Sequence, residues 1–415
     1  MIIPGSGTSK YDIRRIIMDI RLTAEEEARI IDFRHDMHMH PELSHREFRT
    51  TDKIKAFLAS LEGIEILELP KKTTGVVARL VGGKPGCEIG LRADIDAICQ
   101  TEDNDLPWKS LEAGIMHACG HDFHTAGLLG AAMILSRKRD EVPGTVDFLF
   151  QEAEETTDGA REMIDAGLFE VIHPAAFFGE HNRPEVPVGK VVCKNGALMA
   201  AKTNFVIRVF GRGGHGSMPH LCVDPIVASA AIIQSLQTIV SRNTDPLESV
   251  VLSVGSIHGG SIENLVVDKV EMTSSIRALS IEARERAVRR METVVRSTAE
   301  AYECRAEIEY REILPLTFNS EKMYKIAVRA AEAAVGSENV IDVPPTLASE
   351  DFSVFMEKVP SFFYWIGSGT PGETAYAWHQ SRFKADDAGI RVAAEVMASA
   401  CFAFASETVA EIHER

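Results

Sequence analysis

The sequence predicts an α/β protein in which a central mixed sheet flanked by helices is interrupted by a smaller ferredoxin-like α+β domain. In the first half of the chain, strand-like segments alternate with helical ones, which indicates a sheet covered by helices. From about residue 199 the order becomes β-α-β-β-α-β, which is typical of a small split βαβ domain. The length of 415 residues exceeds what one hydrophobic core usually supports, so two domains are expected.

Two helices are expected near the start of the chain. Thr23 and Glu26 have the spacing of a capping box, and the apolar residues that follow recur at helical spacing until Pro41. Ser44 and Glu47 have the same spacing, so we predict that a second helix starts there.

Strands alternate with helices in the rest of the larger domain. Strands are predicted at TGVVARLVG, CEIGLRADIDAI, TVDFLFQ and AAFFGEHN, and a helix is predicted at TAGLLGAAMILSRKRDE. Towards the C-terminus, the apolar strand FFYWIGSG lies between two further helical segments. We therefore predict a discontinuous larger domain of residues 1–198 and 314–415, and an inserted domain of residues 199–313.

The composition limits the classes of partner. The formal net charge of -17 and the lack of a dense Lys/Arg run argue against nucleic acid. No stretch approaches the roughly 18 consecutive apolar residues of a membrane span, and the N-terminal pattern is not that of a signal peptide, so we expect no membrane partner. The seven cysteines are scattered without a CxxC pair, which fits a reducing compartment. We expect a cytoplasmic protein that acts on a small molecule.

Metal-ligand side chains occur in four separate places, each next to a predicted strand end or helix start. Taken singly, each has a structural alternative: a crowded turn before a helix, a solvated acidic loop, or a histidine in a surface loop. Together, sulfur, nitrogen and oxygen donors at four such places favour Zn²⁺ or Mn²⁺ over Ca²⁺ or Mg²⁺. The candidates are Cys119 and His121, Glu152, Glu154 and Glu155, His181, and His379.

The number of donors predicts a hydrolytic centre. These seven candidates can supply five donors, a number that suits two bridged ions that activate a water and polarise the scissile group. Of the two neighbouring carboxylates Glu154 and Glu155, one can bind metal while the other takes the proton from that water and passes it to a leaving nitrogen.

Several motifs together resemble a known family. They include LRADIDA at 91–97, MHACGHDFHTAGLLGAA at 116–132, GTVDFLFQEAEE at 144–155 and GRGGHGSMPH at 211–220. They look like the amidohydrolase branch of the aminoacylase and hippurate hydrolase metallopeptidases, which includes N-acyl-amino-acid amidohydrolases and plant auxin-conjugate hydrolases. The resemblance runs from about residue 24 to the end of the chain.

The resemblance implies a role for each domain and for the candidate residues. Residues 1–198 and 314–415 would form the catalytic metal-binding domain, and residues 199–313 a lid through which a homodimer forms. Two divalent ions, Mn²⁺ or Zn²⁺, would be bridged by one thiolate, and a carboxylate-bearing small molecule would be the substrate. The implied metal ligands are Cys119, His121, Glu155, His181 and His379. The other implied roles are the general base for Glu154, orientation of the site for Asp94, oxyanion stabilisation for His215, and binding of the substrate carboxylate for Asn264 and Arg277.

The chain departs from the family pattern in ways that affect the expected substrate. Glu152 replaces the proline of FQPAEE, Glu180 and Arg183 change the segment that reads LHNWPE in relatives, and Trp378 replaces the leucine of LHS. The metal set is kept, so the expected reaction is C-N bond hydrolysis in an N-acyl or N-aroyl amino acid. The alternative is hydrolytic deamination of a carboxylate-bearing aromatic amine, similar to a nitro-substituted anthranilate, with release of ammonia.

Two rival functions fit less well. Gly211, Gly213 and Gly216 match the dinucleotide-binding pattern, but Pro219 and Pro225 interrupt the helix that should follow, and no acidic residue lies about twenty positions on. A binding protein that uses zinc only for stability would have no use for a second carboxylate beside a metal ligand.

Overall fold

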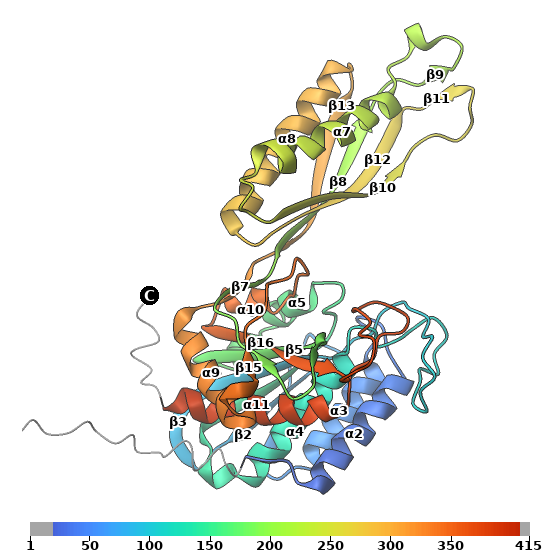
Figure 1. Cartoon of the computed structure of the whole chain (residues 1–415). Helices are drawn as coiled ribbons and strands as arrows, with labels where there is room; N and C mark the ends of the chain where they lie inside the picture. Colours follow the sequence, from blue (N-terminus) through green and yellow to red (C-terminus); the bar gives the residue numbers. More distant parts are fainter. Residues whose placement is uncertain (1–19, 407–415) are drawn as a thin grey trace, which may run out of the picture. The chain divides into compact units, whose positions relative to one another are not determined.

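The computed structural model describes residues 20–406, which form two compact units (Figure 1). Among the described residues, the first unit comprises residues 20–196, 318–343 and 354–406. The second comprises residues 197–317 and 344–353. The second unit therefore extends slightly past the expected segment 199–313 on both sides and takes in a further short segment. The two ends of the expected larger domain lie outside the described residues.

The first unit is built on a mixed sheet of eight strands in the order β1-β2-β4-β3-β5-β16-β6-β15. The central pairs β4/β3, β3/β5 and β5/β16 are parallel, whereas β1/β2, β2/β4 and β16/β6 are antiparallel. The predicted mixed sheet is thus confirmed. The strands are β1 (Ile64–Leu67), β2 (Val76–Val81), β3 (Lys84–Asp94), β4 (Pro143–Gln151), β5 (Ala176–Pro187), β6 (Val191–Val192), β15 (Val340–Ile341) and β16 (Ser361–Gly369).

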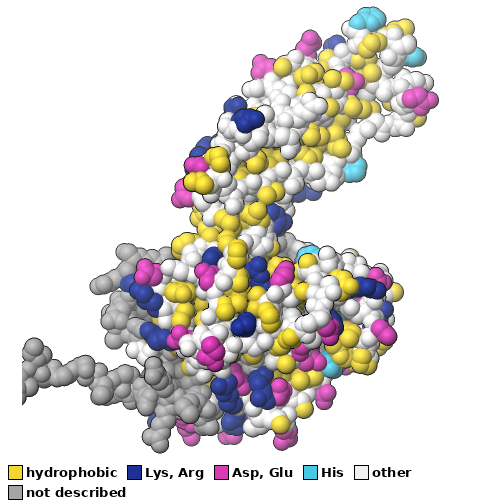
Figure 2. Space-filling view, in the orientation of Figure 1, with side chains coloured by type: hydrophobic (Ala, Val, Ile, Leu, Met, Phe, Trp, Pro, Cys, Tyr) yellow, Lys and Arg dark blue, Asp and Glu magenta, His cyan; other side chains and the backbone are white. Residues whose placement is uncertain are grey.

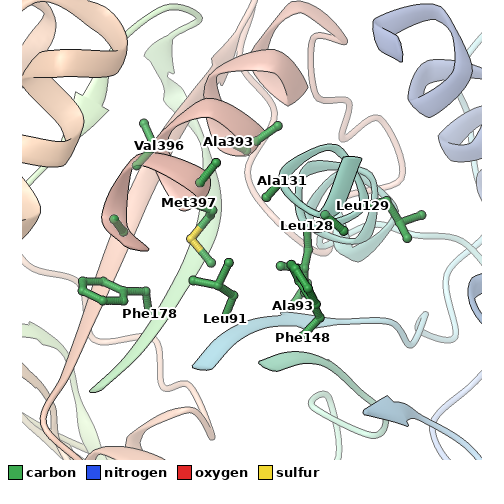
Figure 3. Close-up of a cluster of buried hydrophobic side chains, with 14 of the residues drawn as sticks. Leu91, Ala93, Leu128, Leu129, Ala131, Phe148, Phe178, Ala393, Val396 and Met397 are labelled. Atoms are coloured by element: carbon green, nitrogen blue, oxygen red, sulfur yellow. The ribbon is translucent and has the colours of Figure 1, made fainter. Parts of the chain in front are cut away.

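Helices cover this sheet and complete its core. Figure 3 shows side chains of α4 and α11 meeting side chains of β3, β4 and β5 in one buried cluster. Helix α11 is apolar and long enough to cross a membrane by composition, but 83% of it is buried inside the protein, as expected of a core helix. The helices of this unit are α2 (Ala24–Met39), α3 (Phe48–Ala59), α4 (His121–Arg137), α5 (Gly159–Asp165), α6 (Leu168–Val171), α9 (Glu321–Val335) and α11 (Ala388–Ala405), with α10 (Ser353–Met356) at its boundary.

Glycines allow α4 and α11 to lie close together. A Cβ atom on Gly127 would lie 2.8 Å from the Cβ of Ala393, and one on Gly130 would lie 2.7 Å from the Cβ of Ala394. Both separations are shorter than real Cβ contacts allow, so neither glycine can gain a side chain without a shift of α11.

The two predicted helix starts had different outcomes. The capping box of Thr23 and Glu26 is present and begins α2, as predicted. The second box was a wrong prediction, because α3 begins at Phe48 with no side-chain cap. Ser44 donates to Asp96 instead, and the Glu47 carboxylate accepts hydrogen bonds from other backbone amides. Both side chains are therefore used by the interior of the first unit.

The second unit has the predicted β-α-β-β-α-β order. Its sheet has the order β10-β12-β8-β13, and every neighbouring pair is antiparallel. Side chains of Asp224 and Ser280 cap the two helices, and the helices pack on the sheet over a separate apolar core. The elements are β8 (Ala201–Phe210), β9 (Gly214–His215), α7 (Pro225–Asn243), β10 (Val250–His258), β11 (Leu265–Val266), β12 (Lys269–Ala278), α8 (Ile281–Ala301) and β13 (Arg305–Leu314); β7 (Gly196–Met199) and β14 (Thr317–Asn319) lie where the chain passes between the units.

Candidate metal centre

Four segments of the first unit bring metal-ligand side chains together: the start of α4, the loop after β4, the strand β5, and the loop after β16. The sequence had suggested that His181 follows the end of a strand. Strand β5 instead continues past His181 to Pro187 alongside β16, so this histidine lies within the strand. The donors, in the order of these segments, are Cys119 and His121, Glu154 and Glu155, His181, and His379.

Two groups of three donors share the same thiol. The ligand atoms of Cys119, His121 and His181 all lie within 4.8 Å of one another, and so do those of Cys119, Glu155 and His379. The Cys119 Sγ lies 3.4 Å from His181 Nε2, and Glu155 Oε1 lies 3.3 Å from His379 Nε2. Each group could hold one metal ion, with the sulfur common to both.

A third group places the two glutamates beside His121. The Nε2 atom of His121 lies 3.8 Å from Glu155 Oε1 and 4.0 Å from Glu154 Oε2. Both carboxylate side chains are largely buried, with 8% and 12% exposure for Glu154 and Glu155. Neighbouring carboxylates in the interior are costly unless cations neutralise them, so this arrangement fits divalent ions.

Hydrogen bonds orient the imidazole rings so that Nε2 faces the donor cluster. His121 Nδ1 donates to Asp96 Oδ1 over 3.0 Å, and His181 Nδ1 donates to the backbone oxygen of Asn182 over 2.7 Å. When each ring is neutral, its Nε2 lone pair is available to a metal ion. The Nε2 atom of His121 is buried and makes no hydrogen bond among the described residues. The donor set and this orphaned atom fit a resident divalent cation.

Asp96 supports the centre from three sides. Besides His121, the Asp96 carboxylate accepts from Ser44 Oγ over 2.7 Å and from the backbone amide of Glu155 over 3.0 Å. Burial by itself favours the neutral acid, but the hydrogen bond and charge of His121 outweigh it and lower the pKa of Asp96. This carboxylate therefore links one imidazole donor to the loop that carries both glutamates.

Asp94 lies in a second network behind the ligands. Its Oδ1 atom accepts from His124 Nδ1 over 2.5 Å, and its Oδ2 atom accepts from Arg92 over 2.9 Å. The backbone amide of Asn182 donates to His124 Nε2, so the proton of the neutral His124 ring lies on Nδ1. The contact of Asp94 with His121 Nε2 is longer, at 3.7 Å, so Asp96 rather than Asp94 forms the hydrogen bond that orients this predicted ligand.

Asn182 connects the ligand-bearing loops. Its side-chain amide donates to the backbone oxygen of Cys119 over 2.5 Å, and its Oδ1 atom accepts from Ser368 and Trp378 over 3.2 Å and 3.3 Å. Gly120, which separates Cys119 from α4, has a φ of 91°, and a Cβ atom there would lie 2.3 Å from the Asn182 amide nitrogen. The turn that presents the thiol therefore requires glycine at this position.

The loop after β16 holds His379 in an uncommon backbone conformation. Its φ is 66°, in the left-handed region that residues other than glycine seldom adopt. Its backbone amide donates to the oxygen of Ala118, and its backbone oxygen accepts from the Gln100 side chain. The neighbouring Trp378 packs edge-to-face on the ring of His181, with 4.9 Å between the ring centroids. These contacts fix the two histidine donors relative to each other.

The thiol of Cys119 belongs to a buried residue. Burial, together with the charge of Glu155, raises its pKa well above the ordinary value, so the metal-free thiol is protonated at neutral pH. A divalent cation reverses this preference, because a coordinating thiol is deprotonated. The sulfur is thus suited to act as a metal ligand and unsuited to act as a free nucleophile.

The remaining predicted residues belong to the second unit. His215 is exposed in β9, where its Nδ1 atom accepts from the backbone amide of Ser217, so the proton of the neutral ring lies on Nε2. Asn264 lies beside it, because its backbone oxygen accepts from the amide of Gly216 and the next residue pairs with His215.

Arg277 lies on a different part of the second unit. It projects from β12, donates to the backbone oxygen of Leu347, and lines an open pocket of about 390 Å³ with Thr273, Arg311 and Glu312. Burial lowers the pKa of its guanidinium. The structure thus places His215 and Asn264 side by side and Arg277 apart from them within this unit.

The family model of Peptidase family M20/M25/M40 matches residues 90–402. The chain belongs to this family. The chain is 40% identical over 370 residues to the N-acetylcysteine deacetylase of Bacillus subtilis, covering 89% of this chain and 95% of the relative. It is 32% identical over 370 residues to the N-acetyldiaminopimelate deacetylase of Bacillus cytotoxicus, covering 89% of this chain and 96% of that protein.

The solved structures agree with the sequence match. The crystal structure of Bacillus subtilis YXEP protein, described as a dinuclear metal binding peptidase from the M20 family, has a TM-score of 0.81 and 36% sequence identity. The match covers 93% of this M20 chain and all of that protein. The predicted family, fold and binding of divalent metal ions are therefore confirmed.

Sequence reasoning missed some of the polar residues that support the metal centre. Asp96 and Asn182 were not singled out, and Glu47 was expected only as part of a capping box, because their roles depend on contacts between segments far apart in the chain. Asp96 alone had a detectable signal, because it follows Asp94 by two residues and the two lie on the same side of an extended segment.

Proposed function

We propose that this protein hydrolyses the amide bond of N-acyl or N-aroyl amino acids, using two divalent ions, Mn²⁺ or Zn²⁺. The chain is a metal-dependent amidohydrolase of the M20 family. The observation that carries the proposal is that two donor groups share Cys119 while a further carboxylate, Glu154, lies at their side. The relatives named as deacetylases of N-acetylated amino acids support the substrate class.

The chain's own residues would divide the work as follows. Cys119, His121, Glu155, His181 and His379 would hold the ions. A bound divalent cation lowers the pKa of water and polarises the amide carbonyl. Glu154 would take the proton from the attacking water and deliver it to the nitrogen as the C-N bond breaks. The products are a carboxylic acid and a free amino acid.

Residues of the second unit would recognise the substrate. We propose that His215 stabilises the oxyanion and that Asn264 and Arg277 bind the substrate carboxylate. The Nε2 proton of His215 supports the first role, because an oxyanion requires a hydrogen-bond donor. The planar guanidinium of Arg277 supports the second, because it can bind a carboxylate through two parallel hydrogen bonds.

The proposal extends to assembly and location. Exposed apolar residues on α7, among them Ile226, Val227 and Val240, support a homodimer formed through the second unit. Figure 2 shows apolar side chains gathered over the visible face of this unit. The seven unpaired cysteines support a cytoplasmic location.

The test is a substrate panel with metal-reconstituted protein. N-acetyl amino acids, N-aroyl amino acids and aminobenzoates are offered in parallel, and free amino acid and ammonia are both measured. We expect amino acid from the acylated substrates. Ammonia from the aminobenzoates would instead support deamination of an aromatic amine. Turnover of neither class, with two ions bound per chain, would refute both functions.

A variant pair tests the role of the base. Glu154→Gln should keep the bound metal and lose turnover by about 100-fold or more, because general acid-base catalysis typically contributes 10²–10⁴-fold. Glu62→Gln alters an exposed glutamate and should leave turnover unchanged. Full activity of Glu154→Gln would remove this residue from the mechanism.

A further inference from the structure

A buried ion pair lies at the start of the loop after β4, which carries Glu154 and Glu155. The Glu152 carboxylate is fully buried, and its Oε1 atom pairs with Lys72 Nζ. Lys72 comes from the loop before β2, and its side chain is only 11% exposed. It also pairs with Glu162 of α5 over 2.8 Å. No other lysine or arginine pairs with Glu152 among the described ion pairs, so this carboxylate depends on one cation.

The surrounding backbone is shaped to admit the Glu152 side chain. Gly75, which follows Lys72 by three residues, has a φ of 82°, and a Cβ atom on it would lie 2.2 Å from Glu152 Oε2. On the other side, a Cβ atom on Gly159 would lie 1.9 Å from the backbone oxygen of Glu152. Gly75 thus makes room for the side chain of a residue that occupies the position of a proline in the family pattern, whereas Gly159 lies against the backbone of that residue.

Glu152 is joined to the catalytic glutamates by one residue under backbone strain. Ala153 is buried and has a φ of 55°, in the left-handed region. Its amide donates to Glu47 over 2.9 Å, and its oxygen accepts from the amide of Gly159 over 3.2 Å. Because this short link is held rigidly, a displacement of the Glu152 side chain would be transmitted to Glu154 and Glu155.

We propose that Lys72 is a positioning residue that acts through Glu152 to hold Glu154 and Glu155 in place. The Lys72 ammonium offsets part of the cost of burying the Glu152 carboxylate and fixes the start of the loop. The inference rests on the proposed function for its activity measurements, whereas its metal-binding measurements stand without it.

The two members of the ion pair differ in how many oppositely charged partners surround them. Lys72 faces it from the loop before β2, and Glu162 faces it from α5. His45 and Asp158 lie beyond Glu162 and are exposed. If Glu152 is neutralised, Lys72 keeps Glu162 as a partner, whereas if Lys72 is neutralised, Glu152 keeps no cation.

The first experiment therefore compares neutralisation of Lys72 with neutralisation of Glu152. Lys72→Met should weaken the binding of Mn²⁺ to the metal-free protein, measured by titration calorimetry, by about 10- to 100-fold, as for other residues that orient metal ligands. Glu152→Gln should weaken it by much less, and Lys71→Met, which changes the exposed neighbouring lysine, should have no effect. Equal affinities for Lys72→Met and the wild type would overturn the proposal.

The double variant Lys72→Met/Glu152→Gln removes both charges and controls for misfolding. It should recover most of the affinity lost in Lys72→Met, because no buried charge remains unpaired. If the single variant does not fold, the double variant still decides: affinity close to that of the wild type supports the proposal, and affinity reduced 10-fold or more refutes it.

A pH profile separates positioning from a general loss of stability. Burial already raises the pKa of Glu152, and removal of the Lys72 charge raises it further. Lys72→Met should therefore keep most of its kcat at low pH, where Glu152 is protonated, and lose it as the pH rises. The double variant should show no such loss. A uniform reduction of kcat at every pH would contradict the role proposed for Lys72. A wild type without turnover would refute the proposed function, and the metal-binding measurements would then decide the role of Lys72.

Discussion

Replacement of Asp96 by asparagine should weaken metal binding through His121. All three partners of the Asp96 carboxylate donate: the His121 Nδ1, the Ser44 hydroxyl and the backbone amide of Glu155. Asparagine has one accepting oxygen and one donating NH₂ group. If the oxygen faces His121, the NH₂ group opposes the Glu155 amide. If the NH₂ group faces His121, the ring must carry its proton on Nε2, where the metal should bind.

The expected magnitude follows from the contacts that are lost. Residues that orient metal-ligating histidines typically change metal affinity by about 10- to 100-fold when replaced. Asp96→Asn retains the size of the side chain, so it loses a charge-assisted hydrogen bond at 3.0 Å without leaving a cavity. We therefore expect the affinity of the metal-free protein for Zn²⁺ to fall by at least 10-fold, measured by competition with a chromogenic chelator.

Ser44→Ala provides the matched control for this experiment. It removes one of the three hydrogen bonds to Asp96 but leaves the bond to His121, so the affinity for Zn²⁺ should change by only a few-fold. An affinity of Asp96→Asn within twofold of the wild type would refute the assignment of Asp96 as the residue that orients His121.

Three further predictions concern packing, pH and the aromatic contact. Gly130→Val should lower the free energy of unfolding by about 1–3 kcal/mol in urea denaturation, because a Cβ atom there lies 2.7 Å from that of Ala394; an unchanged value would mean that α11 yields freely. Because burial raises the pKa of Glu47 from 4.5 to about 7, the stability it contributes is complete below pH 4.5 and is lost as the pH rises through 7, an effect of about 3 kcal/mol. Glu47→Gln should remove this dependence, and an unchanged pH profile of unfolding would argue against a buried acid. Trp378→Ala should weaken metal binding by about threefold to tenfold, since it removes the edge-to-face contact with His181, and undiminished affinity would show that His181 needs no such support.

The sequence predicted the elements of the fold better than their arrangement. Periodicity is local, so the alternating segments and the β-α-β-β-α-β order were predictable. The order of the sheet was not, because β5 pairs with β16, about 180 residues later, through contacts that no local pattern encodes. The capping-box prediction at Ser44 and Glu47 was wrong for the same reason, since distant partners compete successfully for both side chains.

For the candidate site, too, some features were predictable from the sequence and others were not. The donor residues were predictable because strand ends in α/β sheets gather ligands and because the motifs resemble a family. Within the segment from His117 to His124, the sequence indicated Cys119 and His121 as the ligands, and the structure shows which partners the neighbouring polar residues contact. Asp122 pairs with Arg34, and His124 with Asp94, whereas Cys119 and His121 face the other donors.

The side chains that hold the donors form a supporting layer around the metal centre. Two of the three imidazole donors, His121 and His181, have one nitrogen fixed by a carboxylate or backbone oxygen, the third is held through the backbone of His379, and the thiol loop is fixed by Asn182. Such a site tolerates few changes among its supports. The departures from the family pattern at Glu152 and Trp378 nevertheless lie within this supporting layer, and each comes with its own partner, Lys72 for the carboxylate and Asn182 for the indole. Because both changes are compensated where they occur, they can alter the loops around the centre while the donor atoms stay in place. The chain can therefore keep the hydrolytic chemistry of its family and still differ from its relatives in the molecules it accepts.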